Sequence, residues 1–82
     1  MSELAYYVGE RVREEREGAD MSQDALSKYT GIHRPNIARI ESGKHLPSLF
    51  VLERIAVTLG IPVSAFVHGA PTPAIPTKHE TA

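Results

Sequence analysis

Apolar side chains recur at helical spacing along most of this sequence, and glycines interrupt them at short intervals. Leu4, Val8 and Val12 follow one another every four residues, as on one face of an α-helix. No alternation of apolar and polar residues is long enough to predict a β-strand. Glycine stands where each of four helices should end: Gly18, Gly31, Gly43 and Gly60. The sequence therefore predicts an all-α fold of short helices.

Serine and proline mark where several of the expected helices begin. Ser22 sits where an N-cap belongs, because its hydroxyl can accept a hydrogen bond from a first-turn N–H group. Pro35 suits the first turn of the third helix, where its missing N–H needs no helical partner. Pro62 and Ser64 open a short fifth helix. We therefore expect five helices.

The end of the chain differs in composition from the rest. Residues 69–82 hold three prolines and a single sizeable apolar side chain, Ile75. Such a segment buries too little apolar surface to offset the entropy lost on ordering. We expect one folded domain over residues 1–68 and a Pro-rich, disordered tail over 69–82.

The residue types present argue against an enzyme and against a metal site. Cysteine is absent from the 82 residues, which excludes a disulfide scaffold, a thiolate zinc site and a cysteine nucleophile. His33, His45, His68 and His79 are 12, 23 and 11 residues apart, which is not the spacing of a preformed metal-binding pair. The glutamates of the first helix form a solvated face without a pocket. We expect no catalytic residue, no metal and no cofactor.

Nothing in the sequence suggests contact with a membrane. The longest apolar run falls far short of the ~18 residues that a transmembrane helix needs. The N-terminus lacks the basic stretch and apolar segment of a signal peptide. A cytoplasmic protein is expected.

The net charge of −1 hides an uneven distribution. Residues 1–21 carry three arginines against six acidic side chains, a balance of −3. Residues 22–47 carry four Lys and Arg against two acidic side chains, a balance of +2. The local electrostatic potential attracts an anionic partner more than the net charge of the chain does. The middle of the chain is therefore the candidate surface for binding such a partner.

That basic segment has the layout of a helix-turn-helix. A short helix ends at Gly31, and a second short helix follows with hydrogen-bond donors on its outer side. Arg34, Asn36 and Arg39 supply these donors. A helix placed in this way can enter the major groove of DNA. Ordinary solvated surface charges are the alternative interpretation of the two arginines.

A series of residues in and around this segment carries a more specific pattern. Its members are Arg16, Ser22, Gln23, Leu26, Gly31, Ile32, Ile37, Ile40 to Lys44, Pro47, Leu49, Ala56 and Leu59 to Ile61. In this order and spacing they resemble the lambda-repressor-like family, which comprises regulators of the phage repressor/Cro and xenobiotic-response-element type. The resemblance covers roughly residues 8–67. Ser27 and Pro35 depart from it, where relatives commonly place alanine and a polar base-reading side chain.

The resemblance implies a five-helix domain that binds double-stranded DNA and regulates transcription. Three residues are implied to read bases: Arg34, Asn36 and Arg39. Three are implied to contact phosphates: Gln23, His33 and Lys44. Arg16 and Glu41 are implied to form an internal ion pair, with two independent surface charges as the alternative.

The fourth helix is apolar on nearly all sides. Its expected core stripe consists of Leu49, Leu52, Ile55, Ala56 and Leu59. Phe50 and Val57 lie on a further face, with Arg54 between them and Val51 beside them. A small domain has little protein to cover that face, so we expect these four residues to form a homodimer interface. A wide core stripe is the alternative.

A homodimer would match a pseudo-palindromic operator, with repression by promoter occupancy as the simplest outcome. Other functions of the same fold remain open. They are an antitoxin with a toxin as its partner, a restriction–modification controller protein, and a module that bridges other proteins.

Overall fold

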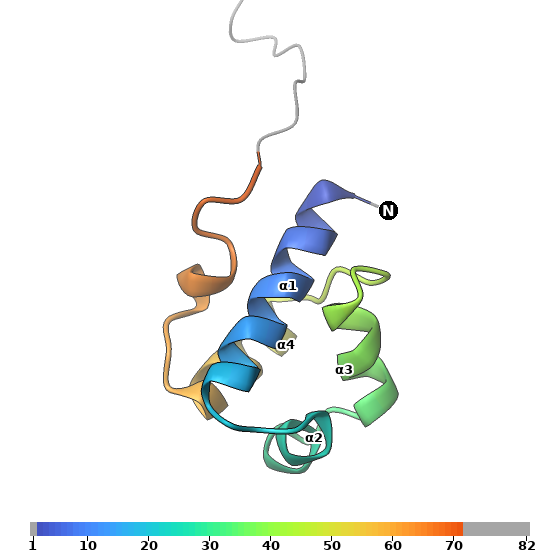
Figure 1. Cartoon of the computed structure of the whole chain (residues 1–82), viewed down its shortest axis with the longest axis vertical. Helices are drawn as coiled ribbons and strands as arrows, with labels where there is room; N and C mark the ends of the chain where they lie inside the picture. Colours follow the sequence, from blue (N-terminus) through green and yellow to red (C-terminus); the bar gives the residue numbers. More distant parts are fainter. Residues whose placement is uncertain (1, 72–82) are drawn as a thin grey trace, which may run out of the picture.

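The computed structural model describes residues 2–71, and all regular structure in that part of the chain is helical (Figure 1). Its elements are α1 (Glu3–Gly18), α2 (Gln23–Thr30), α3 (Arg34–Glu41), α4 (Leu49–Leu59) and η1 (Val63–Phe66). The predicted all-α fold is therefore confirmed. From residue 72 onward, the predicted tail lies outside the described residues. None of the described helices is long and apolar enough to cross a membrane.

The prediction of a fifth α-helix is wrong. Val63–Phe66 forms a single 3₁₀ turn, in which Ala65 N–H donates to Pro62 O and Val67 N–H donates to Ser64 O. Pro62 has extended backbone and Val67 is the C-cap, so only four residues lie between them, a length typical of a 3₁₀ helix. The domain therefore has four α-helices and one 3₁₀ turn.

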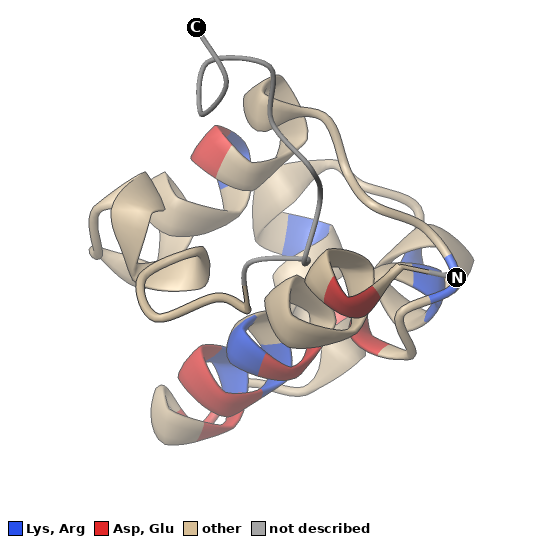
Figure 2. Cartoon of the chain, turned by 90° about the horizontal axis from the view of Figure 1, so that it is seen from above, with Lys and Arg blue, Asp and Glu red and all other residues tan. Residues whose placement is uncertain are grey.

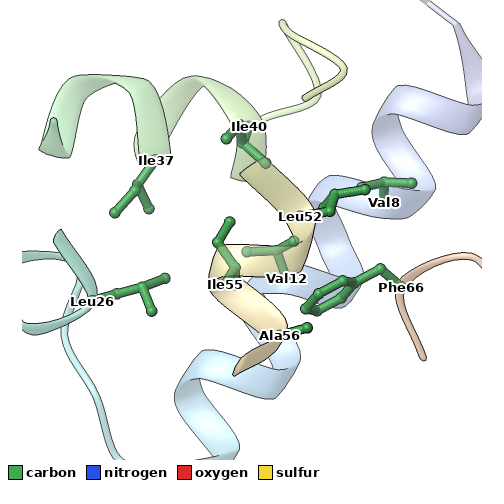
Figure 3. Close-up of a cluster of buried hydrophobic side chains, with 9 residues drawn as sticks. All are labelled: Val8, Val12, Leu26, Ile37, Ile40, Leu52, Ile55, Ala56 and Phe66. Atoms are coloured by element: carbon green, nitrogen blue, oxygen red, sulfur yellow. The ribbon is translucent and has the colours of Figure 1, made fainter. Parts of the chain in front are cut away.

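The helices surround one core (Figure 1). In Figure 1, α1 runs through the middle in front of α4, with α3 on one side, η1 on the other, and α2 at its lower end. Side chains from all five elements converge in the close-up of Figure 3. The buried cluster consists of Val8, Val12, Leu26, Ile37, Ile40, Leu52, Ile55, Ala56 and Phe66.

The helix ends follow the expected local signals. Ser22 Oγ accepts a hydrogen bond from Ala25 N–H at 3.0 Å, and Ser48 Oγ accepts one from Val51 N–H at 3.1 Å. Gly31 ends α2 with a φ of 76°. Glycine adopts this left-handed conformation without steric strain, because it has no Cβ atom. These local contacts set the start of α2 and α4 and the end of α2.

Leu49 does not belong to the core stripe of α4. It is exposed, and it borders a shallow open groove with Phe50, Glu53 and Val63. Helical spacing shows which side chains share one face of a helix. It does not show how far along the helix the neighbouring elements cover that face. The prediction for Leu49 is therefore wrong, whereas Leu52, Ile55 and Ala56 are buried as expected.

Candidate nucleic-acid interface

Hydrogen bonds hold the turn between α2 and α3 in one geometry. Thr30 Oγ1 donates to Leu26 O at 2.7 Å and accepts from Ile32 N–H at 3.1 Å. Ser27 Oγ donates to Ile32 O at 2.5 Å. The serine that departs from the family pattern thus satisfies a backbone carbonyl of the turn. These bonds fix the direction in which α3 leaves α2.

The outer side of α3 presents the predicted donors to solvent. Arg34, Asn36 and Arg39 are exposed, whereas Ile37 and Ile40 of the same helix are buried in the core. His33 stands at the N-cap position and is exposed, and its side chain makes no capping hydrogen bond. The structure thus places the three predicted base-reading residues on the accessible surface of one short helix.

A hollow of about 430 Å³ lies beside this helix. Asn36 and Arg39 border it from α3, and Lys44 and His45 border it from the following loop. Ile32 is among the apolar residues that line it. Arg39 and Lys44 have no carboxylate within 4.0 Å in the described part of the chain, so both charges face the hollow or the solvent.

Arg34 already has partners within the chain. Its Nη1 donates to Gln23 Oε1 at 3.1 Å, and its Nε lies 3.2 Å from Asp24 Oδ1. Asp24 was not among the predicted site residues. Its place in the first turn of α2, across the turn from Arg34, is the signal that could have found it.

Gln23 lies between an exposed arginine and a buried carboxylate. Its Oε1 accepts from Arg34, and its Nε2 donates to Glu41 Oε1 at 3.0 Å. Both ends of its amide are therefore engaged within the domain. Its backbone N–H belongs to the first turn of α2 and so has no partner within the helix, which leaves this group free for the predicted phosphate contact.

Arg16 and Glu41 form a bidentate ion pair in the interior. Arg16 Nε donates to Glu41 Oε2 at 2.6 Å, and Arg16 Nη2 donates to Glu41 Oε1 at 2.9 Å. Their side chains are 9% and 4% exposed. The hydrogen bond to Glu41 raises the pKa of Arg16, so the guanidinium keeps its charge in the interior. Arg16 Nη1 also donates to Met21 O at 2.7 Å, which ties α1 to the start of α2 as well as to α3.

The other arginines of α1 are paired along their own helix. Arg11 contacts Glu14 and Glu15, each at 2.8 Å, and Arg13 contacts Glu10. Figure 2 shows basic and acidic residues interleaved on α1. This helix therefore offers no basic surface, in contrast to α3 and the loop after it.

The outer face of α4 is exposed in the single chain. Phe50 is 65% exposed and Val57 is 74% exposed. Arg54 lies over the Phe50 ring, 5.7 Å from its centroid, and its Nη2 donates to Thr30 O. Val51 is half-buried against the core and serves the fold as well. Three of the four residues predicted for a dimer interface thus form an accessible surface.

Within residues 2–71, no three His, Asp or Glu side chains come together in a group that could hold a metal ion. His79 lies outside the described residues.

Known proteins match this chain over most of the described part. A family model described as helix-turn-helix covers residues 12–66. The chain is 38% identical over 60 residues to the immunity repressor protein of Bacillus phage phi105, a match that covers 73% of this chain and 42% of the repressor. It is 37% identical over 49 residues to an uncharacterized HTH-type transcriptional regulator of Methanothermobacter thermautotrophicus, covering 60% of this chain and 71% of that protein.

Two solved structures have the same fold. The restriction-modification controller protein C.AhdI from Aeromonas hydrophila has a TM-score of 0.73 and 27% identity, and the match covers 76% of this chain and 94% of that one. An HTH_3 family transcriptional regulator from Vibrio cholerae has a TM-score of 0.75 and 25% identity, covering 82% of this chain and 39% of that one. The resemblance to phage-repressor-type regulators is thus confirmed, and the chain belongs to the helix-turn-helix family.

Proposed function

We propose that this chain is a transcriptional regulator that binds double-stranded DNA sequence-specifically and represses by occupying a promoter. One observation carries the proposal. Arg34, Asn36 and Arg39 stand exposed on α3 of a helix-turn-helix whose turn is fixed by hydrogen bonds. Relatives named as a phage immunity repressor and as a transcriptional regulator support it. The same observations favour a binding protein over an enzyme.

Two groups of residues would have different roles at the DNA, one contacting bases and the other contacting phosphates. Arg34 and Arg39 have the geometry for bidentate bonds to guanine, and Asn36 has it for adenine. Lys44, His33 and the backbone N–H of Gln23 would contact phosphates, which set register and affinity rather than sequence preference. Such a regulator would act in the cytoplasm, with no metal or cofactor.

The proposed DNA-binding unit is a homodimer on a pseudo-palindromic operator. The supporting observation is the exposed apolar face of α4 around Phe50 and Val57. A twofold axis through that face would bury each residue against the partner copy. The two recognition helices would then meet half-sites about one helical turn apart.

A restriction–modification controller is the second candidate function. The structural match to the controller protein covers 94% of that chain, so nearly the full length of a known controller has a counterpart here. An adjacent restriction-enzyme gene would favour this role. An adjacent toxin gene would favour the antitoxin role, in which a toxin is the protein partner.

The test is selection of random-sequence DNA duplexes by the full chain, followed by titration of the selected duplex at several salt concentrations. We expect an enriched inverted repeat. If each subunit neutralises about three or four phosphates, log K should fall with log salt with a slope of about −5 to −7. No enriched sequence, or no change in affinity from about 50 to 300 mM salt, would contradict the proposal.

A further inference from the structure

We infer that Arg54 couples the outer face of α4 to the turn between α2 and α3, so that association with a second copy of the chain and binding of DNA strengthen each other. The inference rests on the proposed function and deepens it. It gives a positioning role at the turn to a residue that was predicted only for the dimer interface.

Arg54 contacts the end of α2 and the outer face of α4 at the same time. Its Nη2 donates to Thr30 O, and its Cζ lies 5.7 Å from the centroid of the Phe50 ring. Within residues 2–71, no carboxylate oxygen comes within 4.0 Å of its guanidinium. A helix carbonyl and an aromatic ring therefore hold this charge where an acidic side chain usually would.

Thr30 is the last residue of α2, and it directs the chain into the turn. The final carbonyl groups of a helix have no partner within it, and their partial negative charge favours a cation. In the described part of the chain, no backbone N–H group donates to Thr30 O outside the helix. The Thr30 hydroxyl bonds Leu26 O and Ile32 N–H. Arg54 thus completes the hydrogen bonds around the residue at which the chain turns toward α3.

Gly31 leaves open the space that the guanidinium occupies. A Cβ atom at this position would stand 2.8 Å from Arg54 Nη2, too close for the guanidinium to stay at the Thr30 carbonyl. The glycine that ends α2 therefore also admits the side chain that caps it.

A second copy over this face would select the conformation in which Arg54 caps α2. Arg54 is exposed in the single chain, so water competes for its guanidinium. Burying a charge without a partner is costly, so a copy lying over Phe50 and Val57 can enclose Arg54 only with its bond to Thr30 O in place. Both contacts of the guanidinium also strengthen when water leaves.

The same conformation favours binding of DNA. With Thr30 O capped, the turn is held in the geometry that presents α3, so less motion is lost on meeting the DNA. Because the dimer and the DNA then favour one state, each raises the affinity for the other by the same factor. This coupling acts within each subunit and is separate from the gain that two linked half-sites give.

The test measures dimerisation of the full chain in the presence of DNA that can hold only one subunit. The probe is a short duplex with one half-site of the selected sequence, and a scrambled duplex of equal length is its control. Sedimentation analysis gives the dimer dissociation constant with each duplex. Linked half-sites cannot contribute to this measurement, because each duplex has only one.

Three proteins are compared: wild type, Arg54→Met and Glu53→Gln. Methionine keeps an unbranched apolar side chain against Phe50 but offers no donor to Thr30 O. Glu53→Gln is the matched control, because Glu53 is the exposed neighbour of Arg54 on α4. Circular dichroism verifies that each variant is folded.

We expect the half-site duplex to lower the dimer dissociation constant of wild type about 5- to 20-fold relative to the scrambled duplex, which lies within the usual range for coupled sites. Glu53→Gln should retain this effect. Arg54→Met should lose it, so that the two duplexes give nearly the same dissociation constant.

Hydrogen exchange of the wild-type chain without DNA is a second measurement that needs no variant. Ile32 N–H is bonded to Thr30 Oγ1, so its exchange rate reports opening of the turn. We expect slower exchange of this amide at protein concentrations above the dimer dissociation constant than below it. The N–H of Ala5, bonded to Ser2 Oγ at the start of α1, is the control and should exchange equally fast at both concentrations.

Two results would overturn the inference. If Arg54→Met retains the effect of the half-site duplex, the coupling does not depend on Arg54. If wild type gives equal dissociation constants with the two duplexes, or if exchange of Ile32 does not slow on dimerisation, the two surfaces act independently. Failure of the proposed function is distinguishable, because wild type would then form no dimer or enrich no duplex before any variant is made.

Discussion

At the scale of single residues, burial separates charges that stabilise the domain from charges that face a partner. Glu41 is buried with Arg16, whereas Arg39 and Lys44 are exposed beside a hollow. Removing one member of a buried pair leaves an uncompensated charge in the interior. Removing an exposed charge costs the fold little and changes what the surface can bind. A substitution at a buried charge should therefore mainly lower the free energy of unfolding. A substitution at an exposed charge should mainly lower the affinity for a partner.

Glu41→Ala should lower the free energy of unfolding by about 3–5 kcal/mol, because Arg16 would stay buried without its carboxylate. Urea denaturation monitored by circular dichroism measures this loss. Glu14→Ala on the surface of α1 is the matched control, since Glu14 pairs with Arg11 at half exposure. Its effect should stay within about 1 kcal/mol. Equal losses from the two variants would contradict a special role for the buried pair.

Arg39→Ala should lower affinity for the selected duplex about 5- to 150-fold, the range for one bidentate base contact of ~1–3 kcal/mol. It should relax the preference at one base pair in each half-site and affect non-specific DNA much less. Fluorescence anisotropy on matched and single-substituted duplexes measures both quantities.

Lys44→Ala is the comparison for Arg39→Ala, because a phosphate contact carries no sequence information. This variant should weaken binding to all duplexes alike and make the salt dependence shallower by about one phosphate per subunit. If both variants lower specific and non-specific affinity equally, Arg39 also contacts phosphate, and bases are read elsewhere.

At the scale of helices, the approach of α1 to α3 sets the position of the recognition helix. Gly9 of α1 lies directly against the backbone of α3. A Cβ atom at this position would stand 2.1 Å from Ile40 O and 2.9 Å from Glu41 O. Neither carbonyl can rotate away, because both belong to the helix backbone. The absence of a side chain is therefore what allows these two helices to pack so closely.

Gly9→Ala should force α1 and α3 apart and lower the free energy of unfolding by about 1–3 kcal/mol, the usual cost of overpacking. Gly18→Ala, in the same helix, is the control, since nothing lies within 4 Å of the added Cβ. Alanine has the higher helix propensity, so this control should be neutral or stabilising by up to ~1 kcal/mol. Thermal unfolding of both variants distinguishes them, and similar melting temperatures would contradict the close approach.

At the scale of the whole molecule, the outer face of α4 is an apolar surface that the described part of the chain leaves uncovered. Phe50 and Val57 contribute little to the core, which Leu52, Ile55 and Ala56 fill from the same helix. Burying a phenylalanine side chain stabilises an interface by ~1.5–3 kcal/mol. In a twofold dimer both copies of Phe50 would be buried, so this contribution would be made twice. A dimer formed through this face would therefore gain stability from side chains that the monomer does not need.

Phe50→Glu should abolish the dimer and leave the helical content intact, because the new carboxylate would be desolvated without a partner in the interface. Operator affinity should fall about a hundredfold or more with the loss of linked half-sites. Sedimentation analysis and circular dichroism measure assembly and folding. Tyr6→Glu, an exposed aromatic position on α1, is the matched control. If Tyr6→Glu breaks the dimer and Phe50→Glu does not, the interface lies on α1.

Local sequence signals were enough to predict the all-α fold and the limits of α2 and α4. These features depend on contacts within one helical turn. Ser22 and Ser48 cap the N–H groups three residues ahead, and Gly31 and Gly60 take the left-handed conformation that ends a helix. The placement of basic donors on α3 follows in the same way, because its buried residues recur at helical spacing.

Local sequence did not show which side chains meet across those helices, and the Arg16–Glu41 pair was expected only from the family resemblance. Gln23 is 18 residues from Glu41 and 11 from Arg34, and Arg54 is 24 residues from Thr30. Helical periodicity could not bring them together, because it describes one helix and says nothing of the helix beside it. The same limit accounts for exposed Leu49 and for the 3₁₀ turn at Val63–Phe66. In each case the outcome depended on where a neighbouring element ends, which is a property of packing rather than of local sequence.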